Sequence, residues 1–149
     1  MREVIEAALH RHQTPSARIS VALVDDVRMA HLNKLHLGHE GPTDVLAFDL
    51  RDDPPVPPLV RGGAGGGLGD GAGGLVEGEI VVSVDTAVRE ADKRGHSVEA
   101  ELALYTVHGM LHLLGYDDQH EHDASRMHEV EDEILTALGL GAVYRVNPP

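Results

Sequence analysis

The chain has no cysteine among its 149 residues, so it can form neither a disulfide nor a thiolate metal site. Any bound metal would therefore rely on carboxylates and on the 11 histidines. The sequence also lacks an apolar run long enough to span a membrane, and it lacks a basic-then-apolar leader. Together with a length typical of one domain, these absences predict a cytoplasmic protein in which residues 1–149 form a single domain.

Aromatic and basic residues are also scarce. The chain has no tryptophan, one phenylalanine and three tyrosines, so it offers few rings on which the bases of a single-stranded nucleic acid could stack. The phenylalanine, Phe48, is predicted to lie in the core. The 12 basic residues are outnumbered by 25 acidic ones, which gives a formal charge of −13. The densest basic group is Arg89, Lys93 and Arg94. Binding of a nucleic acid would need a local basic groove, or a partner that presents the nucleic acid.

Hydrophobic periodicity predicts helices that alternate with short strands. The predicted helices cover residues 2–11, 27–37, 86–95, 98–114 and 123–138, and the predicted strands cover residues 18–24, 44–50 and 79–84. Asp25 or Asp26 is the expected N-cap of the second helix, Asp85 that of the third, and Ser97 that of the fourth. This order of elements predicts an α+β (α/β-like) fold in which about five helices cover a small sheet.

The segment of residues 52–77 is rich first in proline and then in glycine. PPVPP favours a stiff, extended backbone, and the glycine run after it has too few side chains to build a packed element. GGAGGG is not followed by the Gly-Lys-Ser/Thr of a phosphate-binding loop. We therefore interpret residues 52–77 as a flexible surface insertion between two strands.

The strongest functional signal is HGMLHLLGYDD, residues 108–118. His108 and His112 are four residues apart, so on a helix both imidazoles lie on one face and can reach a single ion. Gly115 can adopt the left-handed conformation that ends a helix, which would return Asp118 to the histidines. Three protein ligands with an open fourth position are typical of catalytic zinc. The pattern therefore predicts one Zn²⁺ per chain, or another divalent transition metal, in a hydrolase that uses a metal-activated water.

Several alternatives remain open from the residues alone. The histidine pair could be incidental on an amphipathic helix, and His120 or His122 could replace Asp118 as the third ligand. Asp117 could orient a ligand histidine and assist proton transfer, or it could simply form a turn. The motif also resembles the zinc-protease pattern H-E-x-x-H-x-x-G-x-x-H. Gly109 stands where that pattern has its general base, which argues against a protease.

Residues 108–118 closely resemble the signature H-G-x-L-H-L-x-G-Y-D-H of the YbeY endoribonucleases, small metal-dependent bacterial enzymes of ribosomal RNA maturation. Two further segments are similar to blocks of that family: GPTDVLAFDL, residues 41–50, and GEIVVSVDTA, residues 78–87. The blocks keep the family's order, and the likeness covers most of residues 17–140. It implies a mixed sheet of about four strands and hydrolysis of single-stranded ribosomal RNA. It also implies the ribosome or ribosomal proteins as partners, with no role for a membrane or for DNA.

Two positions depart from the family's pattern. The family's last metal histidine falls on Asp118, so the implied metal ligands are His108, His112 and Asp118. The family's arginine, which is thought to support RNA cleavage, falls on Leu37. Arg89 is then the best remaining candidate for a cation beside the scissile phosphate.

Thr43 and Asp44 match a family block, and they either line the cleft or only form a turn. The first hypothesis is accordingly a zinc-dependent endoribonuclease of ribosomal RNA maturation. The second is a metal-binding ribosome assembly factor without nuclease activity, consistent with the missing arginine and the acidic composition. A hydrolase that acts on another phosphoester or on an amide is a third.

Overall fold

The computed structural model describes residues 1–14, 16–51 and 75–141. Within them lie five helices and three strands, which confirms the α+β class and the expected number of helices. In chain order these are α1 (Arg2–Arg11), β1 (Ala17–Val24), α2 (Asp26–Leu37), β2 (Val45–Asp49), β3 (Val76–Ser83), α3 (Val84–Arg94), α4 (Val98–Leu113) and α5 (Glu121–Ala137). Residues 52–74 of the predicted insertion lie outside the described residues.

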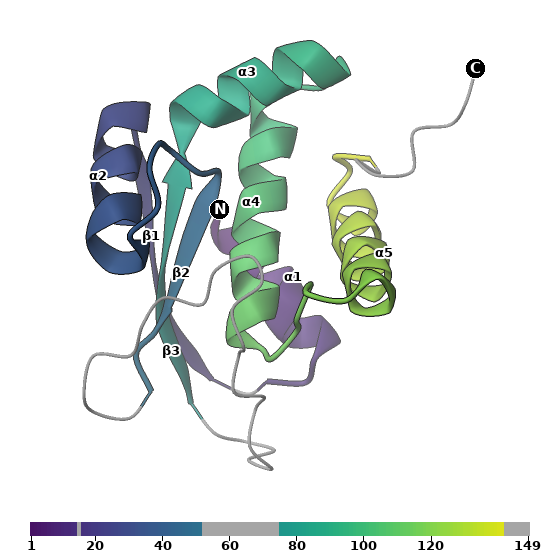
Figure 1. Ribbon diagram of the computed structural model, residues 1–149. Helices are drawn as coiled ribbons and strands as arrows, with labels where there is room; N and C mark the ends of the chain where they lie inside the picture. Colours follow the sequence, from purple (N-terminus) through teal and green to yellow (C-terminus); the bar gives the residue numbers. More distant parts are fainter. Residues whose placement is uncertain (15, 52–74, 142–149) are drawn as a thin grey trace.

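The three strands form one mixed sheet in the order β1-β3-β2 (Figure 1). β3 pairs in parallel with β1, where Ala17 lies opposite Val76, and antiparallel with β2, where Val45 lies opposite Val82. A fourth strand was implied by family likeness alone, and the described residues contain no further stretch of strand-like sequence to form it. β3 also begins earlier than predicted. Val76 and Glu77, assigned to the insertion, extend the strand because they pair with β1.

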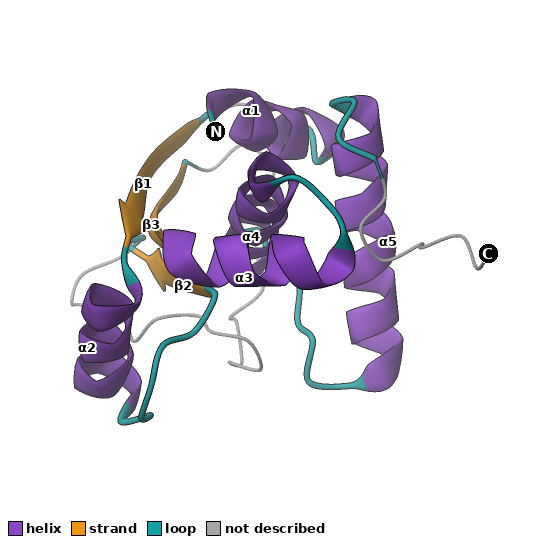
Figure 2. Ribbon diagram, turned by 90° about the horizontal axis from the view of Figure 1, so that it is seen from above, coloured by secondary structure: helices purple, strands orange, loops and turns teal. Residues whose placement is uncertain are grey.

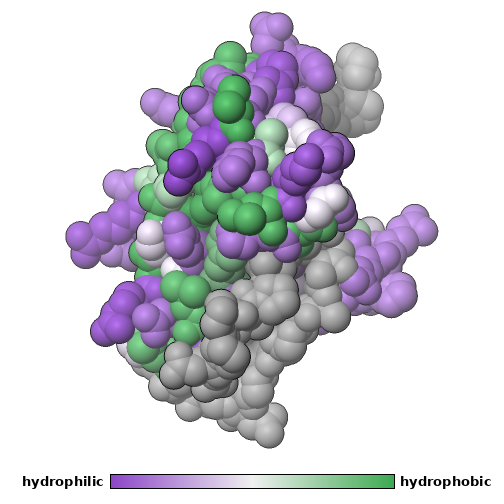
Figure 3. All heavy atoms as spheres, turned by 60° about the vertical axis from the view of Figure 1, so that its left-hand side comes forward, coloured by the Kyte–Doolittle hydropathy of each residue, from purple (hydrophilic) through white to green (hydrophobic). Residues whose placement is uncertain are grey.

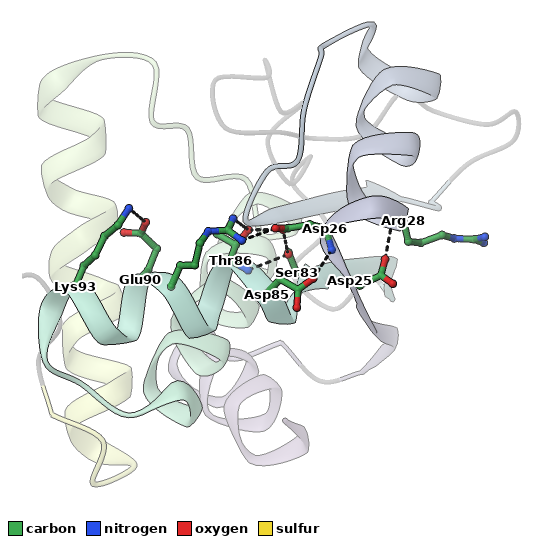
Figure 4. Close-up of polar contacts among 9 residues, drawn as sticks. Asp25, Asp26, Arg28, Ser83, Asp85, Thr86, Glu90 and Lys93 are labelled. Carbon is green, nitrogen blue, oxygen red and sulfur yellow. Dashed lines mark hydrogen bonds and ion pairs between the residues drawn. The ribbon is translucent and has the colours of Figure 1, made fainter.

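The helix N-termini confirm two predicted caps and correct a third. Asp25 caps α2 and Ser97 caps α4, each through a side-chain oxygen that accepts a hydrogen bond from a backbone N–H of the first turn. The cap of α3 is Ser83 and not Asp85, because β3 runs directly into the helix and the cap falls on the last residue of the strand. Asp85 instead accepts a hydrogen bond from the backbone N–H of Asp26 at 2.9 Å, which links the starts of α2 and α3 (Figure 4).

Helix α4 is the centre of the fold. It packs against one face of the sheet and is flanked by α1, α3 and α5, whereas α2 covers the other face (Figures 1 and 2). Successive side chains of a strand point to opposite faces of the sheet. In β3, Ile80 and Val82 therefore pack on the α4 side, whereas Val81 packs on the α2 side. None of the helices in the described residues is both long and apolar enough to cross a bilayer.

The cluster on the α2 side is small. Its fully buried members are Met29, Leu46 and Val81. Phe48 is only partly buried and joins this cluster instead of the larger one, with its ring centroid 5.1 Å from that of His36. Figure 3 shows this side of the molecule, where apolar side chains reach the surface between polar ones.

Candidate metal centre

Two histidines of the buried helix α4 face one carboxylate. His108 and His112 are one helical turn apart, and their Nε2 atoms are separated by 3.1 Å. Asp118 lies in the loop after α4, and its Oδ2 is 3.5 Å from His108 Nε2 and 3.9 Å from His112 Nε2. Gly115, with a φ of +99°, adopts the left-handed conformation that the turn between them requires. The structure therefore brings together the three residues that the motif singled out.

Each imidazole is oriented by a hydrogen bond at its other nitrogen. His108 Nδ1 donates to the buried carboxylate of Glu131 in α5 at 2.5 Å, and His112 Nδ1 donates to the backbone carbonyl of Tyr116 at 3.1 Å. Tyr116 is anchored in turn, because its hydroxyl donates to His12 Nε2 at 2.7 Å. Since both Nδ1 atoms face oxygen acceptors, both Nε2 atoms are directed into the same space, where each ring in its neutral form would present a lone pair.

The electrostatics of this cluster favour a positive charge at its centre. Burial lowers the pKa of His108, but the hydrogen bonds to Asp118 and Glu131 outweigh burial and raise that pKa to about 9. Burial, together with the neighbouring charge of His108, lowers the pKa of His112 to about 4. The protonated form of His108 is thus favoured beside the carboxylates of Asp118 and Glu131. A divalent cation could replace that proton and would better balance the two negative charges.

The spacing of the donor atoms fits one transition-metal ion. Two ligands of a tetrahedral zinc ion, each about 2.0–2.1 Å from the metal, lie roughly 3.3 Å apart. The three distances in the cluster are 3.1, 3.5 and 3.9 Å, which bracket that value. Imidazole nitrogen and carboxylate oxygen are also ligands that zinc accepts, and Glu131 provides the partner that metal-bound histidines usually have. His108, His112 and Asp118 are therefore the candidate ligands.

Gly109 has a structural reason to lack a side chain. A Cβ atom at this position would lie 2.9 Å from Cγ2 of Ile80, a buried residue of β3, which is closer than side chains pack. The residue between the two histidines therefore faces the sheet, where a glutamate could not be accommodated. A general base of the zinc-protease kind is excluded at this position by packing.

His120, His122 and Asp117 are not members of the group formed by His108, His112 and Asp118. His120 is the N-cap residue of α5 and His122 lies in the first turn of that helix, and both are exposed. Asp117 accepts a hydrogen bond from the backbone N–H of Gln119 at 3.0 Å, so its side chain stabilises the turn after α4. Asp118 is thus the carboxylate that meets the histidines.

Arg89 is tied to the start of α2 by its contact with Asp26. Figure 4 shows the polar network around Asp26. The guanidinium of Arg89 forms an ion pair with Asp26 and donates to the Thr86 hydroxyl at 3.1 Å. Asp26 also accepts hydrogen bonds from the hydroxyls of Ser83 and Thr86, at 2.9 and 3.0 Å. The contact with Arg89, more than these hydroxyls, lowers the pKa of Asp26. Arg89 is therefore a half-exposed cation whose charge is already paired.

Thr43 and Asp44, in the loop before β2, combine the two roles that the sequence left open. Asp44 Oδ1 accepts a hydrogen bond from the backbone N–H of Val45 at 2.9 Å, so it does shape the turn. Both residues also line a pocket together with Arg89. The charge of Asp44 also contributes to the raised pKa of His108.

Leu37, the position of the family's arginine, lies at the end of α2. Its side chain packs against the cluster of Met29, Leu46 and Val81 on the face of the sheet opposite to α4. The side chain at this position therefore points away from the two histidines, and a simple exchange to arginine would not place a cation beside them.

Sequence reasoning missed Glu131, which is fully buried and holds His108. A signal was present, because Glu131 falls four residues after Met127 and four before Leu135, within the apolar face of α5. An ionisable residue at such a position needs a buried partner. That partner could not be named from the sequence, since it lies on another helix.

Comparison with known proteins identifies the family. A family model described as Endoribonuclease YbeY matches residues 1–139. The endoribonuclease YbeY of Moorella thermoacetica is 41% identical over 124 residues, which cover 83% of this chain and 74% of that protein. The chain belongs to the YbeY endoribonuclease family. The endoribonuclease YbeY of Desulfitobacterium hafniense is 36% identical over 141 residues, covering 94% of this chain and 84% of its own. The resemblance drawn from three short sequence blocks is thereby confirmed.

A solved structure is similar in fold. The solution structure of TM1509 from Thermotoga maritima superposes with a TM-score of 0.56 and covers 99% of this chain and 86% of its own. The sequence identity is 22%, so this likeness supports the arrangement of elements and says nothing about chemistry.

Proposed function

We propose that this protein is a zinc-dependent endoribonuclease that hydrolyses phosphodiester bonds of single-stranded RNA during ribosomal RNA maturation in the cytoplasm. The observation that carries the proposal is the buried convergence of His108, His112 and Asp118 in a chain of the YbeY family. The family supports RNA as the substrate. The donor set, with neither thiolate nor third histidine, supports one zinc ion or a similar divalent metal.

The protein's own residues hold the site ready for the metal. Glu131 and the carbonyl of Tyr116 keep both Nδ1 atoms protonated and thereby direct both Nε2 atoms to the same point. A bound zinc ion would supply a water of lowered pKa and would polarise a phosphoryl oxygen. Asp118 borders this point and, besides serving as a ligand, would assist proton transfer, whereas Asp117 accepts a hydrogen bond within its turn. Arg89 remains a weaker candidate for contact with the phosphate.

RNA must reach this centre despite the formal charge of −13. The described cations include several that are already paired with carboxylates, such as Arg89 with Asp26 and Arg94 with Glu90. Electrostatic capture of free RNA would therefore be weak. We infer that the ribosome or ribosomal proteins present the RNA strand to the enzyme.

One alternative has its own supporting observation. Leu37 is directed into the cluster beside α2 and Arg89 is paired with Asp26, so neither of these two positions supplies an unpaired cation for transition-state charge. A metal-binding ribosome assembly factor without nuclease activity fits this arrangement.

A cleavage assay separates the two functions. Zinc-loaded protein, the same protein treated with a chelator, and a His112→Ala variant would be incubated with a labelled single-stranded RNA and with ribosomal RNA. The nuclease proposal expects cleavage by the loaded protein alone. Zinc binding and co-sedimentation with ribosomal subunits, without cleavage of either RNA, would favour the assembly factor.

A further inference from the structure

Helix α1 is linked to the candidate metal centre through Tyr116, which lies in the loop that carries Asp118. The backbone carbonyl of Tyr116 accepts the hydrogen bond of His112 Nδ1 at 3.1 Å, and the Tyr116 hydroxyl donates to Nε2 of His12 at 2.7 Å. His12 is the C-cap residue of α1, 104 positions earlier in the chain than Tyr116. A single residue therefore connects the end of α1 to a candidate ligand histidine.

The ring of His12 is held at both of its nitrogens. Nδ1 lies 2.7 Å from the backbone carbonyl of Ala8, one turn earlier in α1. Because a carbonyl can only accept, Nδ1 carries the hydrogen, and in the neutral ring Nε2 is then the acceptor for the Tyr116 hydroxyl. Ala8 is fully buried in the larger apolar cluster, on the α4 side of the sheet. His12 thus presents Tyr116 with an acceptor whose position is set by the body of α1.

The side chain of Tyr116 anchors the loop after α4. Between Gly115 and His120 it is the only hydrophobic residue, and it packs against the larger cluster. Its ring meets that of His12 edge-on, with the centroids 5.3 Å apart, and Cζ of Arg126 in α5 lies 5.7 Å from its centroid. An aromatic ring attracts a cation placed over its face. Contacts from α1 and from α5 therefore fix the position of Tyr116.

A shift of Tyr116 would disturb two candidate ligands together. His112 would lose the acceptor that directs its Nε2 toward the cluster, and Asp118, two residues further along the chain, would move relative to both imidazoles. His108 differs from His112, because Glu131 of α5 holds its Nδ1 without the participation of Tyr116. The two histidines are therefore positioned by separate contacts, and only one of these leads back to α1.

We propose that His12 is a positioning residue of the metal centre, whose hydrogen bond to Tyr116 keeps His112 and Asp118 in the arrangement that binds the metal. The inference rests on the proposed metal-dependent function and deepens it, because it makes α1 a support of a site whose ligands lie on α4 and in the loop after it. Loss of the acceptor at His12 should weaken metal binding and disturb His112, and it should leave His108 in place.

The first measurement is the affinity for zinc, by competition with a chelator. His12→Ala removes the acceptor and should bind zinc about three- to tenfold more weakly, the effect of one hydrogen bond. Tyr116→Phe removes the donor and should show the same loss, and the double variant should lose no more than either single one. His12→Gln supplies an amide oxygen as acceptor and should recover most of the affinity. His10→Ala, exposed on the same helix, is the matched control and should equal the natural chain.

The second measurement is an NMR spectrum of the histidine ring nitrogens in metal-free protein, which reports on each ring separately. In His12→Ala the signals of His112 should shift, because the Tyr116 carbonyl is no longer held in place. The signals of His108 should stay unchanged, because Glu131 still holds that ring. A merely structural role of His12 would change both rings or neither.

The two measurements also separate this inference from the proposed function. Unchanged zinc affinity in His12→Ala, an equal loss in His12→Gln, additive losses in the double variant, or signals of both rings that shift together would overturn the role of His12. Tight zinc binding by every variant would leave the metal centre intact and remove only this role. If the natural chain bound no zinc while the His112 signals alone shifted in His12→Ala, the hold of α1 on His112 would stand and the metal-dependent function would fail.

Discussion

Helices α4 and α2 lie on opposite faces of the same sheet, and they differ in burial and in what they carry. Thirteen of the 16 residues of α4 are buried, and they include the polar side chains Glu101, Tyr105, His108 and His112. In α2 two of 12 residues are buried, and Val27 and Leu35 are 80% and 66% exposed. The two candidate ligand histidines therefore lie on the helix with the most surrounding structure.

The difference shows what a buried polar site requires. A charged or polar group can be tolerated inside a protein when neighbouring elements satisfy it, and α4 has such neighbours in α5 and in the loop after it. Glu131 and the carbonyl of Tyr116 hold the histidines. Helix α2 has fewer packing partners and could not keep ligand side chains fixed. Its polar contacts tie its own N-terminus to α3 (Figure 4).

The largest expected effect is a loss of zinc affinity when the contact between Glu131 of α5 and His108 is weakened. Glu131→Gln keeps the side-chain volume but weakens the hold on His108, and loss of such a partner typically reduces metal affinity about 10- to 100-fold. Competition with a zinc chelator would measure the change. Glu129→Gln, an exposed position on the same helix, is the matched control and should match the natural chain. Equal zinc affinity in both variants would mean that α5 only packs against α4.

A smaller effect, on the stability of the fold, is expected at Gly109, where α4 packs against the sheet. Gly109→Ala gains about 1 kcal/mol of helix propensity, but the added methyl group must displace Ile80, and overpacking typically costs about 1–3 kcal/mol. We expect a net loss of about 1 kcal/mol, or roughly 4 °C in melting temperature. The double variant Gly109→Ala/Ile80→Ala should lose less than the sum of the two single changes. Additive losses would contradict the close contact.

The smallest effect on stability is expected for a substitution of Leu37, on the α2 side of the sheet. Leu37→Arg removes a half-buried side chain from a minor cluster, and the long arginine can extend to solvent, so the cost should be about 0.5–1 kcal/mol. Urea unfolding would measure it. Zinc content and RNA cleavage should stay unchanged, because this side chain points away from α4. An increase in cleavage would contradict this placement, since it would mean that the end of α2 reaches the bound RNA.

Local patterns were sufficient to predict most of the elements and the three residues that the structure brings together as candidate ligands. The spacing of His108 and His112 with a following glycine and Asp118 needs one helix and one turn, and both can be read from neighbouring residues. The predictions that were wrong or missing concern residues whose place depends on segments distant in the sequence. Val76 belongs to β3 because it pairs with Ala17, 59 positions earlier in the chain. Glu131 matters because α5 packs against α4, and Leu37 faces the second cluster because α2 lies across the sheet.

In the proposed metal centre, one ion is held by α4 and the loop after it. Zinc titrated into metal-free protein, followed by calorimetry, tests this claim most directly. The natural chain should bind about one equivalent at high affinity, as expected for three protein ligands. The variant His108→Ala/His112→Ala should bind none at that affinity. Equal binding by the two proteins would contradict the metal centre described here.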